Sequence, residues 1–330
     1  MLLKGISTPP KPNAKWAVFQ KTRKMTLPVN RVFSRAQKFF TIGSCFAEEI
    51  RKALVAQNVL CLPEYSRIKV DPNRMRIDTL PAREHMNYYN TFSIRQEFER
   101  VAGLWQQEEG DFWTLPNRAI DNAMVVRGDG QVFQDPYRRL VFGSCEADLW
   151  DAIQQVNEAF TAGVRAADVF VITLGMTEVF RKLSDGRVAN QIPVYAGGGG
   201  LAETEFHNSD YLENLRNMEV TLSLIREINP EAQIVLSVSP VPLERTFSGE
   251  DVFVANMQSK STLRAVAGAI VRRYDFVHYF PGYEIVSGIG AAAYDERDMV
   301  HIKPEIVEVI VAAFVNTHFE AVLADQEAQP

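Results

Sequence analysis

Cysteine is scarce in this 330-residue sequence, and the three that occur, Cys45, Cys61 and Cys145, form no CxxC motif. This pattern excludes a disulfide-stabilised miniprotein and is typical of a reducing compartment, so we expect a cytoplasmic location. Long apolar runs are also missing. No stretch reaches about 18 apolar residues without charges, and residues 1–12 lack the apolar run of a signal peptide. The sequence therefore predicts no membrane span and no secretion signal.

Acidic residues are absent from the first 40 positions, which carry nine Lys and Arg residues. Since the whole chain has 35 basic and 41 acidic residues, the remainder carries a net charge of −15. An acidic body disfavours nucleic-acid binding, because phosphate contacts need a basic face. We interpret residues 1–34 as a solvated basic arm, with a binding tail as the alternative. The hydrophobic content of 46% is that of an ordinary globular protein.

Short apolar runs that end in turn residues predict buried strands at residues 38–42, 168–174, 233–238 and 274–280. Helical patterns lie between and after them, at residues 47–57, 146–162, 211–228, 256–273 and 304–324, with Ser144 as the expected N-cap of the second. Residues 58–145 are expected to add one core strand and a lid-like insertion. The alternation predicts an α/β fold with a doubly wound, mostly parallel sheet.

Polar residues follow the predicted strands at Ser44, at the Gly175-Met176-Thr177-Glu178 turn and at Ser239. Ligands bind beyond the carboxyl ends of the strands in doubly wound sheets, so these positions are the first candidates for a site. Ser44 stands between a strand and a helix, where backbone N–H groups can stabilise an oxyanion. The alternative interpretation of Ser44 is an ordinary helix N-cap.

Asp298 and His301 form a DxxH segment directly before the last helix. At this spacing the carboxylate can accept a hydrogen bond from one ring nitrogen, which leaves the other to take a proton from a serine. A surface position for His301 is the alternative. Among the other histidines, His207 is a weaker candidate base. His278 lies within an apolar strand pattern and His318 lies on the last helix.

Several strings resemble one known family. Residues 41–47 read TIGSCFA and contain the motif that names the GSCFA-domain family. Further similar strings occur in the same order at residues 89–94 (YNTFSI), 173–178 (TLGMTE), 239–243 (SPVPL), 259–264 (SKSTLR) and 279–284 (YFPGYE). The resemblance covers roughly residues 35–320. A second Gly-Ser-Cys tripeptide, at residues 143–145, has flanks that do not match, so Ser144 is not expected to share the role of Ser44.

The resemblance implies a fold like that of SGNH/GDSL hydrolases, a flavodoxin-like three-layer sandwich with loop insertions. In that superfamily a serine after the first strand is the nucleophile and a C-terminal DxxH supplies the Asp and the His of the triad; the matching residues here are Ser44, Asp298 and His301. The third block, usually Gly-x-Asn-Asp, reads Gly175-Met176-Thr177-Glu178 and replaces the oxyanion-binding amide with a hydroxyl. Asn90 is an amide in another matching string and a candidate replacement.

The sequence thus predicts a serine-dependent acyl-ester hydrolase or O-acyltransferase that acts on a carbohydrate-like or small polar ester. Gly175, Thr177, Asn90 and Glu178 are the expected oxyanion- and substrate-binding residues, and no metal or organic cofactor is required. The alternative is a glycan- or partner-binding module that kept the fold and lost the chemistry. We expect a single domain at residues 35–325, with insertions near residues 60–140 and 182–210. The sequence leaves the oligomeric state open.

Overall fold

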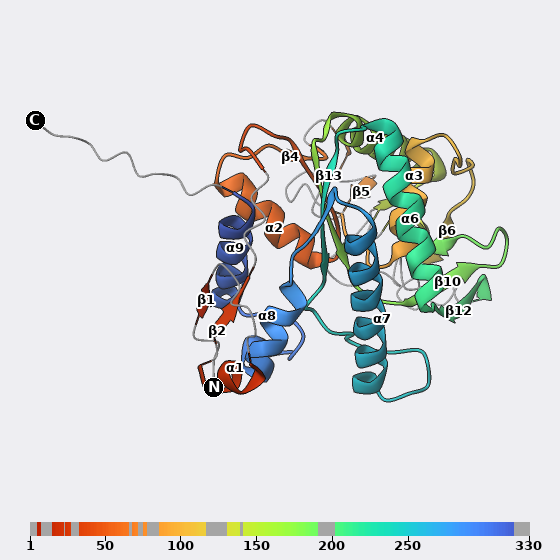
Figure 1. Cartoon of the computed structure of the whole chain (residues 1–330). Coiled ribbons are helices and arrows are strands. Elements are labelled where there is room, and N and C mark those ends of the chain that lie inside the picture. The colour runs from red at the N-terminus through yellow and green to blue at the C-terminus, as the bar shows by residue number, and fades with distance from the viewer. Residues whose placement is uncertain are drawn as a thin grey trace, which may run out of the picture.

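The computed structural model shown in Figure 1 describes residues 5–7, 15–22, 24–27, 33–65, 68–71, 75–77, 86–116, 131–138, 141–190 and 202–319. Every sequence-predicted site residue lies within these ranges. Parts of the predicted basic arm and of both predicted insertions lie outside them, as do His85 and the end of the predicted helix after residue 319.

A five-stranded sheet forms the centre of the described part of the chain. Its strands are β3 (Phe39–Gly43), β4 (Cys61–Leu62), β9 (Val169–Leu174), β13 (Gln233–Val238) and β14 (Val277–Tyr279). They lie in the order β14-β13-β9-β3-β4, and every neighbouring pair is parallel. Numbered along the chain, this is the 2-1-3-4-5 order of flavodoxin-like folds. The predicted α/β fold with a mostly parallel sheet is confirmed, and β4 is the additional core strand.

Helices cover both faces of this sheet (Figure 1). One face packs against α2 (Cys45–Ala56), α8 (Gly282–Ile289) and α9 (Pro304–His318), with the short 3-10 helix η3 (Gly290–Ala293) beside them. The other face packs against α3 (Thr91–Val101), α4 (Glu146–Ala166), α6 (Tyr211–Ile228) and α7 (Val252–Arg273). Neighbouring strand residues alternate between the two cores: Phe39 faces the first and Phe40 the second. Because successive residues face opposite sides and each side is covered by a core, most strand positions are buried. The strands therefore read as continuous apolar runs.

Most predicted elements form where the sequence places them, and the differences lie at their ends. The bounds of β13 and α6 agree with the prediction. The strand predicted at residues 274–280 is shorter, because Tyr274 and Asp275 complete the turn after α7. The expectation that Ser144 is the N-cap of α4 is wrong. Cys145 holds that position, and the Ser144 hydroxyl instead donates to Asp148 Oδ2 at 2.9 Å.

Two smaller antiparallel sheets come from the regions of the predicted insertions. One contains β5 (Met75–Ile77), β6 (Trp113–Pro116), β7 (Gln131–Gln134) and β8 (Val141–Gly143) in the order β5-β8-β7-β6. The other contains β10 (Glu178–Lys182), β11 (Val188–Ala189) and β12 (Thr204–Asn208) in the order β11-β10-β12. Near the N-terminus, β1 (Gly5–Ser7) pairs with β2 (Lys24–Thr26), and α1 (Trp16–Thr22) lies between them in sequence. The boundaries of the predicted domain stay a prediction.

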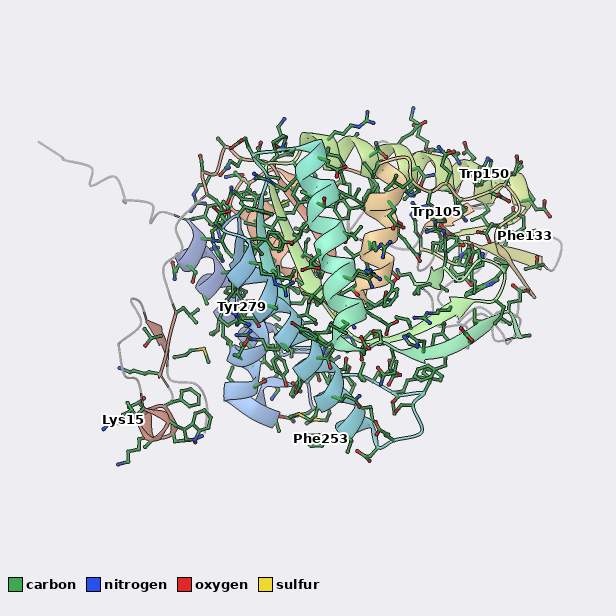
Figure 2. The ribbon with its side chains drawn as sticks, turned by 45° about the vertical axis from the view of Figure 1, so that its right-hand side comes forward. Lys15, Trp105, Phe133, Trp150, Phe253 and Tyr279 are labelled. Atoms are coloured by element: carbon green, nitrogen blue, oxygen red, sulfur yellow. The ribbon has the colours of Figure 1, made fainter. Side chains whose placement is uncertain are left out.

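Aromatic side chains gather at one end of the molecule, where Figure 2 labels Trp105 and Phe133 of the first insertion and Trp150 of α4. Trp113 is buried, whereas Trp105 is partly exposed and packs edge-on against Tyr137, with the Arg187 guanidinium over its ring. These tryptophans therefore pack into the insertion rather than forming an open aromatic surface.

The contact between β3 and β9 at Gly43 is exceptionally close. Gly43 has a φ of +135°, and a Cβ built on it would lie 2.3 Å from the Thr173 carbonyl oxygen. Both features require glycine, because side chains rarely adopt that backbone conformation and no room is left for one. The chain order changes direction between these same two strands, which in flavodoxin-like sheets marks the ligand-binding edge. The strands are thus closest where the candidate site begins.

We expect Gly43→Ala to destabilise the protein more than Gly186→Ala, as measured by urea denaturation. Gly186 also has a positive φ, of +70°, but nothing lies within 4 Å of its built Cβ. The control should therefore lose about 1–2 kcal/mol from backbone strain, whereas Gly43→Ala adds an overpacking cost of about 1–3 kcal/mol. Equal losses in the two variants would contradict the close approach of β3 and β9.

Candidate functional site

Ser44 lies at the carboxyl end of β3 and is the N-cap of α2. Its side chain is buried, with its Oγ 3.1 Å from Thr173 Oγ1 and accepting a 3.3 Å hydrogen bond from the Phe46 N–H. The Ser44 N–H donates to Thr173 Oγ1 at 2.9 Å. Thr173 therefore holds both the hydroxyl and the amide of Ser44. The structure supports the N-cap interpretation locally and also places Ser44 at the switch point of the sheet.

Asp298 and His301 form the predicted pair, with 2.6 Å between Asp298 Oδ2 and His301 Nδ1. A tight turn brings them together: Met299 adopts a φ of +57°, and Asp298 Oδ1 accepts from the backbone N–H groups of Val300 and His301. These backbone hydrogen bonds, followed by the contact with the imidazole, hold the pKa of the Asp298 carboxyl well below its usual range. The carboxylate therefore stays ionised and orients the ring through Nδ1.

A cavity of about 380 Å³ separates the start of α2 from the loop that carries His301. Cys45 and Phe46 line it on one side, and His301 and the first turns of α9 line it on the other. His301 is largely exposed, with 72% of its side-chain surface accessible. Among the described residues no hydrogen bond joins Ser44 to His301. The fold therefore brings the imidazole to a cavity formed by the immediate neighbours of Ser44, while the hydroxyl itself faces Thr173.

The Gly175-Met176-Thr177-Glu178 turn follows β9, and each predicted residue in it already has a protein partner. The N–H groups of Gly175 and Met176 both donate to the Tyr89 carbonyl at 2.9 Å. A Cβ on Gly175 would lie 2.7 Å from that same oxygen, so glycine is needed for the approach. Thr177 Oγ1 donates to Asn208 Oδ1 at 2.7 Å. The turn is thus held rigidly in position.

Glu178 at the end of this turn and Asn90 near it are both buried. The Asn90 side chain is the N-cap of α3, because its Oδ1 accepts from the Ser93 N–H at 2.8 Å. The preceding residue, Tyr89, accepts a hydrogen bond from the Gly175 N–H, so Asn90 lies close to the end of β9. Glu178 accepts hydrogen bonds from the Thr246 hydroxyl and from the Phe247 N–H, the latter at 3.0 Å. Glu178 therefore anchors the loop before α7.

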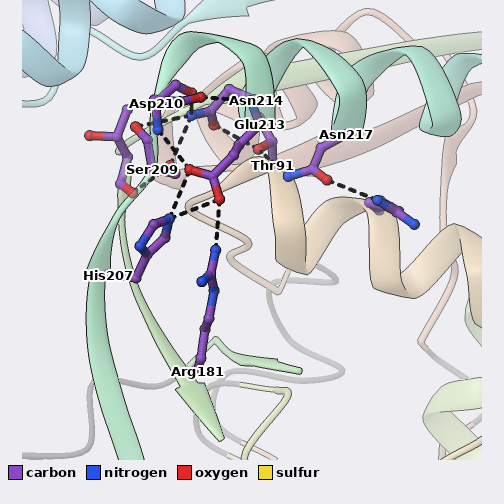
Figure 3. Close-up of polar contacts among 10 residues, drawn as sticks. Thr91, Arg181, His207, Ser209, Asp210, Glu213, Asn214 and Asn217 are labelled. Carbon is purple, nitrogen blue, oxygen red and sulfur yellow. Dashed lines mark hydrogen bonds and ion pairs between the residues drawn. The ribbon is translucent and has the colours of Figure 1, made fainter. Parts of the chain in front are cut away.

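A polar network behind Thr177 fixes the start of α6 (Figure 3). Ser209 Oγ donates to the Thr177 carbonyl at 2.7 Å, and Asn214 Nδ2 donates to Ser209 Oγ at 2.8 Å. Asp210 and Glu213 form a capping box. Burial would raise the pKa of Glu213, but hydrogen bonds from the Asp210 N–H and from His207, together with the charge of Arg181, lower it.

Three further histidines lie within the described residues, and each is engaged by or packed among other side chains. His207 is bound to Glu213 at 2.8 Å, so it is occupied in the network behind Thr177. His278 is partly buried on β14, and burial lowers its pKa. His318 is fully buried among Phe33, Phe280 and Phe314. In the described part of the chain, His301 is the histidine that lines the cavity next to Ser44.

Lys260 is a residue of this edge whose role the sequence reasoning missed. It lies on α7, only 1% exposed, and its Nζ donates to the Gly175 carbonyl at 2.6 Å. Its neighbour Ser259 accepts from the Thr177 N–H at 3.0 Å. Burial lowers the pKa of Lys260 to about 7, an effect that nearby Cys45 partly offsets. A signal was present, since Lys260 precedes the buried residues Leu263 and Ala267 by three and seven positions and shares their helix face.

The described residues contain no cluster of three or more His, Cys, Asp or Glu side chains arranged to hold a metal ion. Within the same ranges, no helix has the combination of length and apolar character that crossing a bilayer requires.

The sheet order and the residues at its carboxyl edge define an α/β protein of flavodoxin-like topology with a candidate site at the β3–β9 switch point. A model of the GSCFA family matches residues 38–314. The chain therefore belongs to the GSCFA family.

Comparisons beyond the family are distant. No curated protein sequence matches the chain. One similar solved structure is a family 3 carbohydrate esterase from Clostridium thermocellum, at 10% identity and a TM-score of 0.34, covering 85% of this chain and 94% of that one. Another is a protein from Streptococcus pneumonia provisionally identified as a platelet activating factor, at 15% identity and a TM-score of 0.30. That match covers 49% of this chain and 64% of the other. At these scores neither likeness bears on the chemistry of this chain.

The buried Lys260 amine predicts a specific dependence of stability on pH. Its pKa is about 7 in the folded protein and about 10.5 when unfolded, so between these values the unfolded state binds the extra proton. Its contribution to the free energy of unfolding should therefore rise by about 1.4 kcal/mol per pH unit from pH 7 to pH 10. Below pH 7 the contribution stays constant at its least favourable value.

Urea denaturation of the wild type and of Lys260→Met at several pH values measures this effect, because the difference between them cancels the other titrating groups. A difference that does not change between pH 7 and pH 10 would show that the Lys260 pKa is not lowered.

Proposed function

We propose that the protein is a serine-dependent acyl-ester hydrolase or O-acyltransferase acting on a carbohydrate-like or small polar ester, related in fold and mechanism to the SGNH hydrolases. The observation that carries the proposal is the Asp298–His301 pair, 2.6 Å apart, which faces a cavity formed by the residues next to Ser44. The cavity volume of about 380 Å³ is enough for a small ester group. We keep a cytoplasmic location as part of the same proposal.

In this reaction Ser44 Oγ turns from Thr173 to the cavity and adds to the ester carbonyl carbon, while its proton passes to His301 Nε2. The negative charge that forms on the carbonyl oxygen must be held by nearby donors. Collapse of the tetrahedral intermediate breaks the bond to the alcohol, which leaves with the proton from His301. Water or an acceptor hydroxyl then releases the acyl group from Ser44 by the same steps. Asp298 orients the imidazole throughout.

One observation favours a second candidate, a glycan- or partner-binding module without catalysis. The Ser44 side chain is buried, and its hydroxyl is engaged by Thr173 and by the Phe46 N–H. The amides of Ser44 and Gly175 also have protein acceptors. A site used only for binding has no need to release these groups, whereas the enzyme must move the Ser44 hydroxyl during each turnover.

We expect a fluorophosphonate probe to modify Ser44, with peptide mass spectrometry locating the label. His301→Ala should slow labelling, and hydrolysis of 4-nitrophenyl acetate, by about 10³–10⁴-fold because the general base is lost. Ser144→Ala is the matched control, since Ser144 lies in the second Gly-Ser-Cys tripeptide at residues 143–145 and the variant should keep full labelling of Ser44. No label on Ser44 in the wild type would support the binding module, and a label on Cys45 would reassign the nucleophile.

Asn90 is expected to act both as a helix cap and as an oxyanion donor, and two variants separate these roles. Asn90→Ser keeps a capping hydroxyl but removes the amide N–H groups, so it should lower kcat by about 10²–10³-fold with stability nearly unchanged. Asn90→Ala should lose the same activity and in addition about 1 kcal/mol of stability. If Asn90→Ser keeps kcat while Asn90→Ala only unfolds more easily, Asn90 is a cap alone.

A further inference from the structure

Lys260 places a buried amine at the carboxyl end of β9, among the residues proposed to react. Its Nζ is bound to the Gly175 carbonyl at 2.6 Å, two residues beyond the Thr173 side chain that holds Ser44. Cys45, which lines the cavity together with His301, lies close enough to interact electrostatically with Lys260. Since β9 and β3 are neighbours, the amine lies at the same sheet edge as Ser44.

Lys260 differs from another buried lysine, Lys182, in the negatively charged partner that would balance its charge. Lys182 is 6% exposed and contacts the Asp111 carboxylate and the Tyr137 hydroxyl. Among the described residues, no carboxylate lies within ion-pair distance of Lys260. An unpaired buried ammonium is costly, and an apolar side chain would fill the same space without that cost. Such groups are concentrated at functional sites, where a ligand supplies the opposite charge.

The hydrogen-bond donors at this edge of the sheet also favour a ligand-binding role for Lys260. The Ser44 N–H is bound to Thr173, and the Gly175 and Met176 N–H groups are bound to Tyr89. These backbone groups cannot hold a new anion without giving up their partners. An ammonium has three N–H groups, and the Gly175 carbonyl takes one of them. Lys260 thus retains donor capacity where the backbone amides do not.

We propose that Lys260 is the anion-binding group of this site, and that its ammonium holds a negatively charged oxygen derived from an acyl group. Two species carry such an oxygen: a carboxylate product and the tetrahedral intermediate formed at Ser44. The second of these rests on the proposed function, whereas binding of a carboxylate does not. Because the group is buried, a charged hydrogen bond there is stronger than in water.

Ser259 and Gly175 keep the ammonium in place. Ser259 binds the Thr177 amide, and the Gly175 carbonyl binds Nζ, so α7 and the turn after β9 are tied at two adjacent points. A fixed donor costs little reorganisation when charge develops, which is the requirement for stabilising an anionic intermediate.

The test is a titration with sodium acetate at pH 6, where Lys260 is protonated, in protein carrying ¹³C-labelled lysine. The Lys260 signal is assigned by its loss in Lys260→Gln, a variant that keeps a neutral donor for the Gly175 carbonyl but removes the charge. We expect acetate to shift the Lys260 signal in a saturable way, and sodium chloride at the same ionic strength to leave it unchanged. Lys52→Met, which removes an exposed lysine of α2, is the control and should bind acetate as the wild type does.

Calorimetric titration should show acetate binding weakened about 10- to 100-fold in Lys260→Gln, the loss expected for one charged hydrogen bond. In 4-nitrophenyl acetate hydrolysis the same variant should lose about 10²–10³-fold in kcat, with a smaller change in KM. A purely structural role would instead lower the melting temperature and leave acetate binding intact. Ser259→Ala separates the two roles, since it removes the adjacent tie to the turn but keeps the ammonium: it should lower the melting temperature and weaken acetate binding much less than Lys260→Gln does.

A Lys260 signal that does not respond to acetate, or equal acetate affinity in Lys260→Gln and the wild type, would overturn the proposal. Failure of the probe to label Ser44, with acetate still bound at Lys260, would instead refute catalysis and leave the anion site standing.

Discussion

The contact between Gly43 and Thr173 is the constraint on which the candidate site depends. Because Gly43 has no side chain, β3 approaches β9 until the Thr173 carbonyl fills the place of a Cβ. That approach puts Thr173 Oγ1 within hydrogen-bond distance of both the amide and the hydroxyl of Ser44. Ser44 in turn begins α2, so one strand-to-strand contact sets the nucleophile candidate, the helix start and the edge of the cavity together.

A second set of contacts fixes the turn after β9. The Tyr89 carbonyl binds the Gly175 and Met176 amides from one side, and Lys260 binds the Gly175 carbonyl from the other. The turn is therefore fixed by residues from the insertion before α3 and from the middle of α7. Thr177 takes part through its backbone and its bond to Asn208, which makes it a structural member of the turn in this state.

The two halves of the proposed machinery differ in how firmly they are held. Ser44 is buried and hydrogen-bonded at the carboxyl end of β3, whereas Asp298 and His301 lie on an exposed loop closed by the turn at Met299. Packing of α9 and η3 near α2 brings that loop to the cavity. Catalysis would require the Ser44 hydroxyl to leave Thr173, and this movement is what distinguishes an enzyme from a binding module built on the same fold.

The sequence by itself determined the layered α/β fold, because buried parallel strands must be apolar on both faces and their helices must lie between them. It also determined the Asp298–His301 pair, because the two residues are only three positions apart and a single turn brings their side chains together. Only the tertiary structure decided that Thr173 binds Ser44, that Tyr89 occupies the Gly175 amide, and that Lys260 is buried against its carbonyl. These contacts join residues about 80 to 130 positions apart, so no local pattern specifies them, and they depend on how closely the strands and helices pack.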